Sequence, residues 1–155
     1  MSFQLAHPDG DHVPRVVTKP LAAAQDFLEG TLLLEDANGA YAECGADPAA
    51  IAAVAPNGAG ADSSGFNILG KKEFPPGYMD GIAVKGQTFS AKYVGALPAA
   101  DGGSYGGVKD TDNYWKVDFN EVVNTRVVLV GRRTTSPENI ARVLVRFLDA
   151  NVQTI

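Results

Sequence analysis

The sequence predicts one mainly β domain, and three observations support this. Its apolar residues fall in short runs, Gly, Pro, Asn-Gly and Asp-Gly separate these runs, and some runs alternate with polar residues. The chain has 155 residues, which suits a single domain that buries a core without disulfides or metal ions. We expect an extended N-terminal arm over residues 1–14 and one β domain over residues 15–155, with long irregular loops.

Residues 1–14 predict an arm because isolated apolar residues are mixed there with proline and glycine, so no periodicity develops. Ordering such a segment costs roughly 1 to 2 kcal/mol of backbone entropy per residue. Burial of Phe3, Leu5 and Val13 returns only about 1.5 to 3 kcal/mol each. We therefore expect the arm to be disordered in the free monomer and ordered by a partner.

The β signals begin at Arg15. A β-branched run, Arg15–Thr18, is stopped by Pro20. Two apolar runs, 31–35 and 40–44, flank Asn38-Gly39, which is the strongest short-range hairpin signal. We expect a hairpin here, with both turn residues at positive φ.

A second hairpin is expected where Lys85-Gly86-Gln87 separates residues 81–84 from 88–94. The small residues 49–55 indicate a strand or a helical turn. Strands are also predicted at Tyr114–Phe119, by its alternation of apolar and polar residues, and at Thr125–Gly131, by its β-branched content. Loops are predicted by their Gly, Pro and Ala content at residues 56–65, 71–77 and 95–107.

Residues 137–150 are compatible with either a helix or a strand. Ser136-Pro137-Glu138 is a good helix start, and apolar residues follow it at helical spacing. However, Val143, Val145 and Phe147 alternate with other side chains, and Val145 would lie on the polar face of a helix. We favour a strand at 141–148 that pairs antiparallel with 125–131, and keep the helix as the alternative.

Composition excludes several classes of protein. The net charge of −5 argues against a nucleic-acid partner, and no apolar run approaches the roughly 20 residues of a membrane span. The N-terminus lacks the basic start and apolar stretch of a secretory signal, and the single cysteine, Cys44, fits a reducing cytoplasm as a buried thiol. The charge is uneven: residues 1–65 carry nine acidic and two basic side chains, whereas residues 66–155 carry nine and eleven.

The sequence offers few groups for catalysis or metal binding. His7, Asp9, Asp11 and His12 are competent metal ligands, but they lie in a flexible segment, so a solvated turn is favoured. Residues 110–113 resemble a calcium loop without its glycine and final glutamate, and are interpreted as a turn. We expect no catalytic, cofactor or metal residues.

Two further groups of residues are candidates for catalysis or sugar binding. Ser63 and Ser64 lack the frame of a nucleophile elbow and have no histidine after residue 12 to act as a base. Tyr105, Tyr114 and Trp115 would form a sugar-stacking face if they were exposed, but aromatic residues at strand spacing favour a core.

The stretch from Glu29 to Gly95 resembles the head decoration, or cement, proteins of tailed bacteriophages, in particular the lambda type with its small β-tulip fold. The resemblance is carried by Gly30-Thr31-Leu32-Leu33-Leu34, by Gly39-Ala40-Tyr41-Ala42-Glu43, by the Ala-rich residues 49–55, and by the segments 80–84 and 88–93. Residues 105–110 and 114–118 are similar to short sequence segments that are common in phage structural proteins. The resemblance covers residues 29–95 and these two shorter segments, and the C-terminal part is longer than in the family.

This resemblance implies a β-tulip or β-barrel-like domain without catalytic residues, placed on the exterior of a virion capsid after a stage in the host cytoplasm. The partners it implies are the major capsid protein and further copies of the chain, as a trimer on the capsid, with a monomer in solution as an open alternative. The expected contact residues are Phe3, Leu5, Val13, Arg15 and Val17. Two alternatives remain: a carbohydrate- or receptor-binding adhesion module of a virion, and a small enzyme with a metal at residues 7–12.

Overall fold

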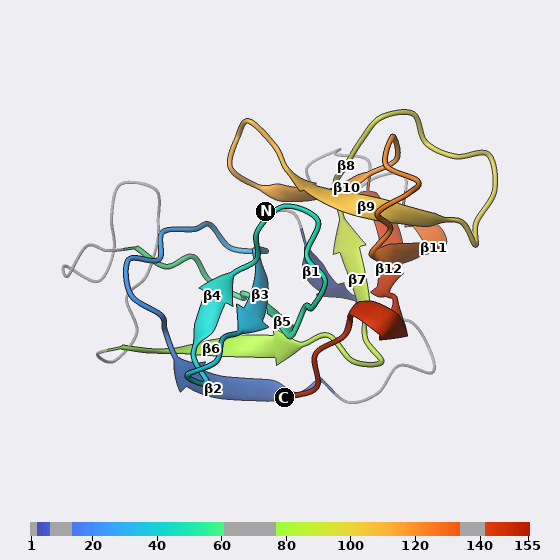
Figure 1. Cartoon of the computed structure of the whole chain (residues 1–155). Coiled ribbons are helices and arrows are strands. Elements are labelled where there is room, and N and C mark those ends of the chain that lie inside the picture. The colour runs from blue at the N-terminus through green and yellow to red at the C-terminus, as the bar shows by residue number, and fades with distance from the viewer. Residues whose placement is uncertain (1–2, 7–13, 61–76, 134–141) are drawn as a thin grey trace.

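The computed structural model describes residues 3–6, 14–60, 77–133 and 142–155 (Figure 1). Within these residues the chain forms two open, mostly antiparallel sheets of seven and five strands, and one short 3-10 helix, η1 (Asp149–Asn151). The expectation of a mainly β domain is confirmed. The sheets do not close into a barrel.

The seven-stranded sheet has the order β1 (Gln4–Ala6), β7 (Thr88–Ala91), β12 (Arg142–Phe147), β11 (Val127–Arg133), β9 (Ser104–Lys109), β10 (Trp115–Asp118) and β8 (Tyr93–Val94). Its pairs are antiparallel except for β10 with β8. The five-stranded sheet has the order β2 (Val16–Pro20), β6 (Tyr78–Ala83), β5 (Ala53–Val54), β3 (Leu32–Glu35) and β4 (Tyr41–Glu43), with all pairs antiparallel.

The main core joins the two sheets. Leu32 and Val54 from the five-stranded sheet belong to the same buried cluster as Phe89, Val117 and Leu129 from the seven-stranded sheet. A second buried cluster, centred on Tyr41 and Met79, covers the other face of the smaller sheet. The smaller sheet is therefore packed on both faces near β3 and β5.

The hairpin predicted around Asn38-Gly39 is confirmed, since β3 pairs with β4 across this turn. The Gly39 N–H donates to the Asp36 carbonyl at 3.0 Å, and Gly39 adopts a φ of 76°. Asn38 is not among the residues at positive φ, so the expectation of two left-handed residues is wrong. The Asp36 carboxylate accepts the N–H groups of Asn38 and Ala40, which holds the turn with one left-handed residue.

The hairpin predicted across Lys85-Gly86-Gln87 is wrong. A tight turn does form, with the Gln87 N–H donating to the Val84 carbonyl at 3.2 Å. However, β6 and β7 belong to different sheets, because β6 pairs with β2 and β5, whereas β7 pairs with β1 and β12. The turn carries the chain from one sheet to the other.

The strand favoured near the C-terminus is confirmed. β12 pairs antiparallel with β11 and also with β7, and Val143, Val145 and Phe147 are buried. Pairing on both edges explains why strand alternation prevails over helical spacing there. The possible helix start at residues 136–138 lies outside the described residues.

The loop predicted at residues 95–107 is partly wrong, because β9 begins at Ser104 and contains two glycines. At Gly106 an added Cβ would lie 2.5 Å from the Cγ of Glu121. The lack of a side chain at Gly106 thus lets Glu121 approach the strand closely. From composition alone, the same glycines predict a loop. The strands predicted at 114–119 and 125–131 are confirmed as β10 and β11.

The N-terminal residues correct the expected arm. Phe3 is 2 % exposed, and its ring lies 5.6 Å from that of Phe147. Gln4–Ala6 forms β1, paired antiparallel with β7 of the same chain. The hydrogen bonds expected from a partner are supplied within the chain, so residues 3–6 are part of the domain. Residues 7–13, with Val13 and both histidines, lie outside the described residues.

We predict that Phe3→Ala lowers the free energy of unfolding by about 3 to 5 kcal/mol, as removal of a buried aromatic ring does. Leu5→Ala, at a half-buried position of β1 two residues after Phe3, is the matched control and should cost clearly less. Chemical denaturation measures both. Unchanged stability of Phe3→Ala would show that β1 is detached and that the original arm prediction is correct.

Gly39 and Gly45 offer a second matched pair. An added Cβ meets no atom within 4 Å at either glycine, but only Gly39 has positive φ. Gly39→Val should therefore destabilise the protein by about 1 to 3 kcal/mol through backbone strain alone. Gly45→Val should leave stability within about 0.5 kcal/mol of the parent. Equal denaturation midpoints for the two variants would contradict the assigned turn.

Candidate interaction surface

β2 is an edge strand of the smaller sheet, and its hydrogen bonds with β6 determine which of its backbone groups face outward. The Ala83 N–H donates to the Arg15 carbonyl, and the Leu21 N–H donates to the Gly77 carbonyl. In an antiparallel pair, the backbone N–H and C=O groups of successive residues point alternately toward and away from the partner strand. The odd-numbered residues between Arg15 and Leu21 therefore also bond to β6. The backbone groups of Val16 and Thr18 therefore point away from the sheet.

The other sheet edges differ from β2. The outer edge of β4 is covered, since the Ala22 N–H donates to the Tyr41 carbonyl and the Glu43 N–H donates to the Gln25 side chain. β1 and β8 have only three and two residues. Within the described parts of the chain, β2 is thus the longest edge with backbone groups directed outward. It lies at the lower rim of Figure 1, below β6.

The position of β2 is fixed by a contact across the sheet. The Tyr41 hydroxyl donates to the Val17 carbonyl at 2.8 Å and passes over Gly81, where an added Cβ would lie 2.7 Å from the hydroxyl oxygen. Burial, with smaller contributions from Glu35 and Asp80, raises the pKa of Tyr41 to about 12. The hydroxyl therefore remains a donor at physiological pH.

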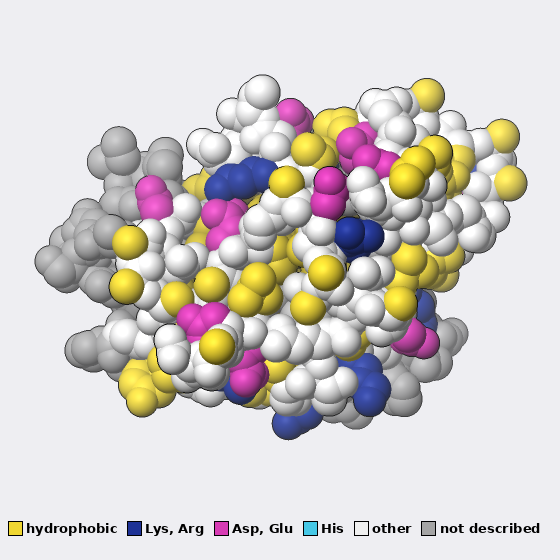
Figure 2. All heavy atoms as spheres, viewed as in Figure 1, with side chains coloured by type: hydrophobic (Ala, Val, Ile, Leu, Met, Phe, Trp, Pro, Cys, Tyr) yellow, Lys and Arg dark blue, Asp and Glu magenta, His cyan; other side chains and the backbone are white. Residues whose placement is uncertain are grey.

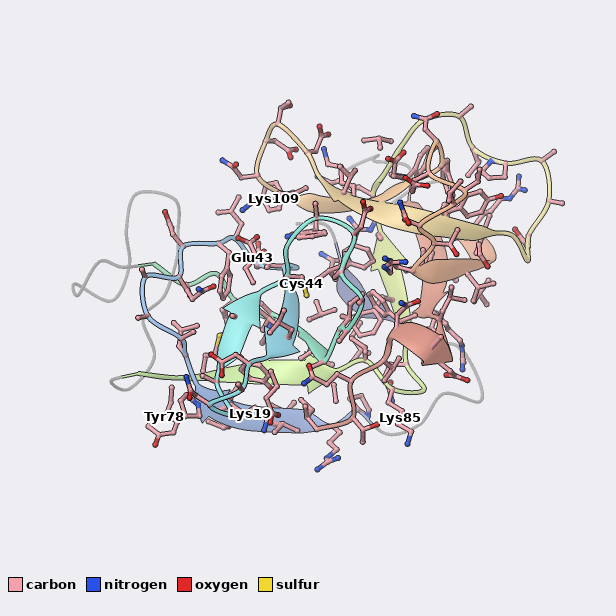
Figure 3. The ribbon with its side chains drawn as sticks, in the orientation of Figure 1. Lys19, Glu43, Cys44, Tyr78, Lys85 and Lys109 are labelled. Carbon is pink, nitrogen blue, oxygen red and sulfur yellow. The ribbon has the colours of Figure 1, made fainter. Side chains whose placement is uncertain are left out.

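The side chains of β2 alternate between exposed and half-buried. Val16 is 58 % exposed and Tyr78, which pairs with Pro20, is 52 % exposed. Lys19 is held by an ion pair with Glu35, with 2.7 Å between Nζ and Oε2. Thr18 donates through its hydroxyl to Asp80. The edge therefore combines an outward backbone with exposed apolar side chains at both ends, and Figure 3 shows Tyr78 and Lys85 at opposite ends of this region.

The five predicted contact residues are thus separated. Phe3 lies in the core and Leu5 packs against it. Arg15 is exposed at the start of β2, and Val17 is half-buried. Sequence reasoning missed Tyr78, because a loop signal precedes it, although Pro20 at the end of a β-branched run was a signal of an edge strand.

A different polar cluster connects the sheets. The Glu43 carboxylate of β4 accepts the Trp115 indole N–H at 2.9 Å and the Lys109 ammonium at 2.9 Å. Figure 3 shows Glu43 and Lys109 close together, with Cys44 beside them. The adjoining pocket has a volume of about 350 Å³ and includes Asp118. Trp115 is 2 % exposed, so the prediction that it is a core residue is confirmed.

The remaining candidate groups that the structure describes have structural roles. Lys116 forms ion pairs with Asp110 and Asp112 at 2.7 and 2.8 Å, so an ammonium group lies where the calcium-loop pattern would place a cation. Its hydrogen bond lowers the pKa of Asp110. Cys44 is buried, as predicted, and burial raises the pKa of its thiol to about 12. Ser63 and Ser64 lie outside the described residues.

Within residues 3–6, 14–60, 77–133 and 142–155, no group of three or more His, Cys, Asp and Glu side chains is arranged to hold a metal ion. No helix in those same segments is long and apolar enough to cross a membrane. Comparison of the chain with protein-family models, curated proteins and solved structures finds no match.

Proposed function

We propose that this protein is a non-enzymatic structural protein that binds the outer surface of a viral capsid and stabilises it. The observation that carries the proposal is the outward edge of β2, with Val16 and Tyr78 exposed beside it. Such an edge accepts a strand from a partner, because the partner's backbone completes hydrogen bonds that the described strands of the sheet do not make.

The resemblance to phage decoration proteins also supports the proposal. Its segments 30–34, 39–43, 49–55 and 80–84 contribute to β3, β4, β5 and β6, which lie side by side in the smaller sheet. The segment 88–93 continues into the larger sheet as β7. The residues that carry the resemblance thus fall mainly in the sheet whose edge is β2.

The proposed mechanism is collective stabilisation. Each copy binds a folded capsid site through β2, and a ligand that binds only the assembled state stabilises that state by mass action. The two sheets give a rigid body behind the edge, because Glu43 of one sheet is bonded to Lys109 and Trp115 of the other. The partners are the major capsid protein and further copies of the chain, as a trimer on the capsid. The proposed location is the capsid exterior, with a stage in the host cytoplasm during assembly.

The carbohydrate-binding alternative is less well supported. It needs exposed aromatic rings, but Trp115 is buried and Tyr105 packs edge-on against Phe119 with 4.8 Å between ring centroids. Tyr78 alone is more than half exposed among the aromatic residues of the described segments. A single exposed ring gives a poor platform for sugar stacking.

We predict that Thr18→Pro weakens binding to undecorated capsids by about tenfold or more, since it removes one outward N–H and places a ring in the path of an added strand. The fold should survive, because edge strands tolerate proline. Thr18→Val is the matched control: it keeps the N–H but loses the hydroxyl contact with Asp80. Co-sedimentation with capsids and DNA release on heating measure binding and protection, and circular dichroism checks the fold.

Two outcomes would contradict the proposal in different ways. Equal binding and protection by Thr18→Pro and the parent protein would remove β2 from the mechanism. Absence of binding by the parent protein to capsids of the virus that encodes it would reject the decoration function.

A further inference from the structure

A pocket of about 270 Å³ opens at the start of β2. Arg15 and Lys85 lie on its rim, and the small side chains of Ala52 and Ala83 form part of its floor. The C-terminal residues 153–155 close one side. Figure 3 shows Lys85 directed away from the ribbon at this end of the molecule.

The wall formed by Gln153 is fixed. Its side-chain oxygen accepts the Glu35 N–H at 2.9 Å, and its side-chain nitrogen donates to the Glu35 carbonyl at 2.9 Å. The Gln153 N–H donates to the Ile51 carbonyl at 2.9 Å. This side chain is therefore committed to the sheet. Of the two charged side chains that line the pocket, Arg15 donates to the Ile155 carbonyl, so Lys85 is the charged group left to face a ligand.

The charge of the pocket differs from that of the chain. The chain has a net charge of −5, yet among the described residues that line the pocket both charged side chains are positive. Arg15 donates to the Ile155 carbonyl at 2.5 Å. Figure 2 shows Lys and Arg side chains along the lower rim of this face, on the side where β2 and the C-terminal segment lie in Figure 1.

Lys85 is also distinct among the lysines of the described segments. Lys19, Lys109 and Lys116 form ion pairs, and Lys92 lies 5.8 Å from the centroid of the Tyr114 ring. Lys85 is exposed and makes no ion pair within those segments. Its ammonium group is therefore available to a carboxylate from outside the chain.

The pocket adjoins the proposed docking edge. Arg15 directly precedes Val16, and Lys85 follows the end of β6, which pairs with β2. Tyr78 lies at the opposite end of the same pair of strands. A strand added along β2 would therefore have one end at a positive pocket and the other beside an exposed aromatic ring.

We propose that this pocket receives an acidic side chain, Asp or Glu, from the partner segment that adds to β2. The inference rests on the proposed docking at β2 and specifies the chemistry of the partner. The Coulomb attraction of the Lys85 ammonium, with Arg15 beside it, favours a carboxylate, and the alanine floor accepts the methylene groups of a glutamate. The pocket thereby selects the register of the added strand, because a one-residue slip would move the carboxylate to the other side of that strand.

The first test uses the free protein and a blocked peptide. Acetyl-Thr-Val-Glu-Val-Thr-amide should shift the backbone NMR signals of Val16, Lys85 and Thr154 at millimolar concentration. The analogue with Gln in place of Glu should bind about two- to fivefold more weakly, the range expected for one exposed ion pair. Equal affinity of the two peptides, shifts confined to other surfaces, or no binding of the acidic peptide would overturn the inference. Equal shifts with free acetate would show that the pocket binds any small anion, and would overturn its proposed selection of the register of an added strand.

The second test uses capsids. Lys85→Gln should weaken binding by about two- to fivefold, with the difference reduced at high salt, and Lys85→Arg should restore it. Lys92→Gln is the matched control and should bind as the parent does. If Thr18→Pro abolishes binding while Lys85→Gln leaves it unchanged, the inference fails and the docking edge stands. If the parent protein does not bind capsids, the proposed function fails, and the peptide titration still decides whether the pocket accepts a carboxylate.

Discussion

The structure depends on the turn that carries the chain from β6 to β7. Val84 ends one sheet, where its N–H donates to the Ala52 carbonyl at 3.1 Å, and Thr88 begins the other. Because only residues 85–87 separate the two positions, the two sheets are held together at this corner. The core between them follows from this constraint, since Val84 and Phe89 belong to the same buried cluster. Lys85 is placed at the surface for the same reason: it lies at the corner, outside both sheets.

The need to cover the edges of the two sheets explains where several other segments lie. Unsatisfied backbone groups at an edge invite pairing with other chains, so most edges are short or covered. β1 covers β7, and the segment at Ala22 and Gln25 covers β4. β2 is the exception among the described strands, and Tyr41 holds it in place from the opposite face. An exposed edge that is held rigidly in place is the feature on which our functional proposal rests.

Local sequence signals predicted much of the fold. Alternation predicted β10 and β12, and Asn-Gly predicted the turn between β3 and β4, because these features act over a few residues. Sequence reasoning failed where distant contacts decide. Phe3 is buried because the next residues pair with β7 and its ring packs against Phe147. Gly106 can lie in β9 because Glu121 leaves no room for a side chain there. Arg15 was expected to make a partner contact, but its placement beside Lys85 depends on the pairing of β2 with β6.

The central claim is that β2 presents an open edge in the free protein. Amide hydrogen exchange of the isolated chain measures this directly, residue by residue. The Val17 and Lys19 amides, which face β6, should exchange slowly, whereas the Val16 and Thr18 amides, which face outward, should exchange rapidly. Equal and strong protection of all four amides would show that the edge is already covered, and it would contradict the account.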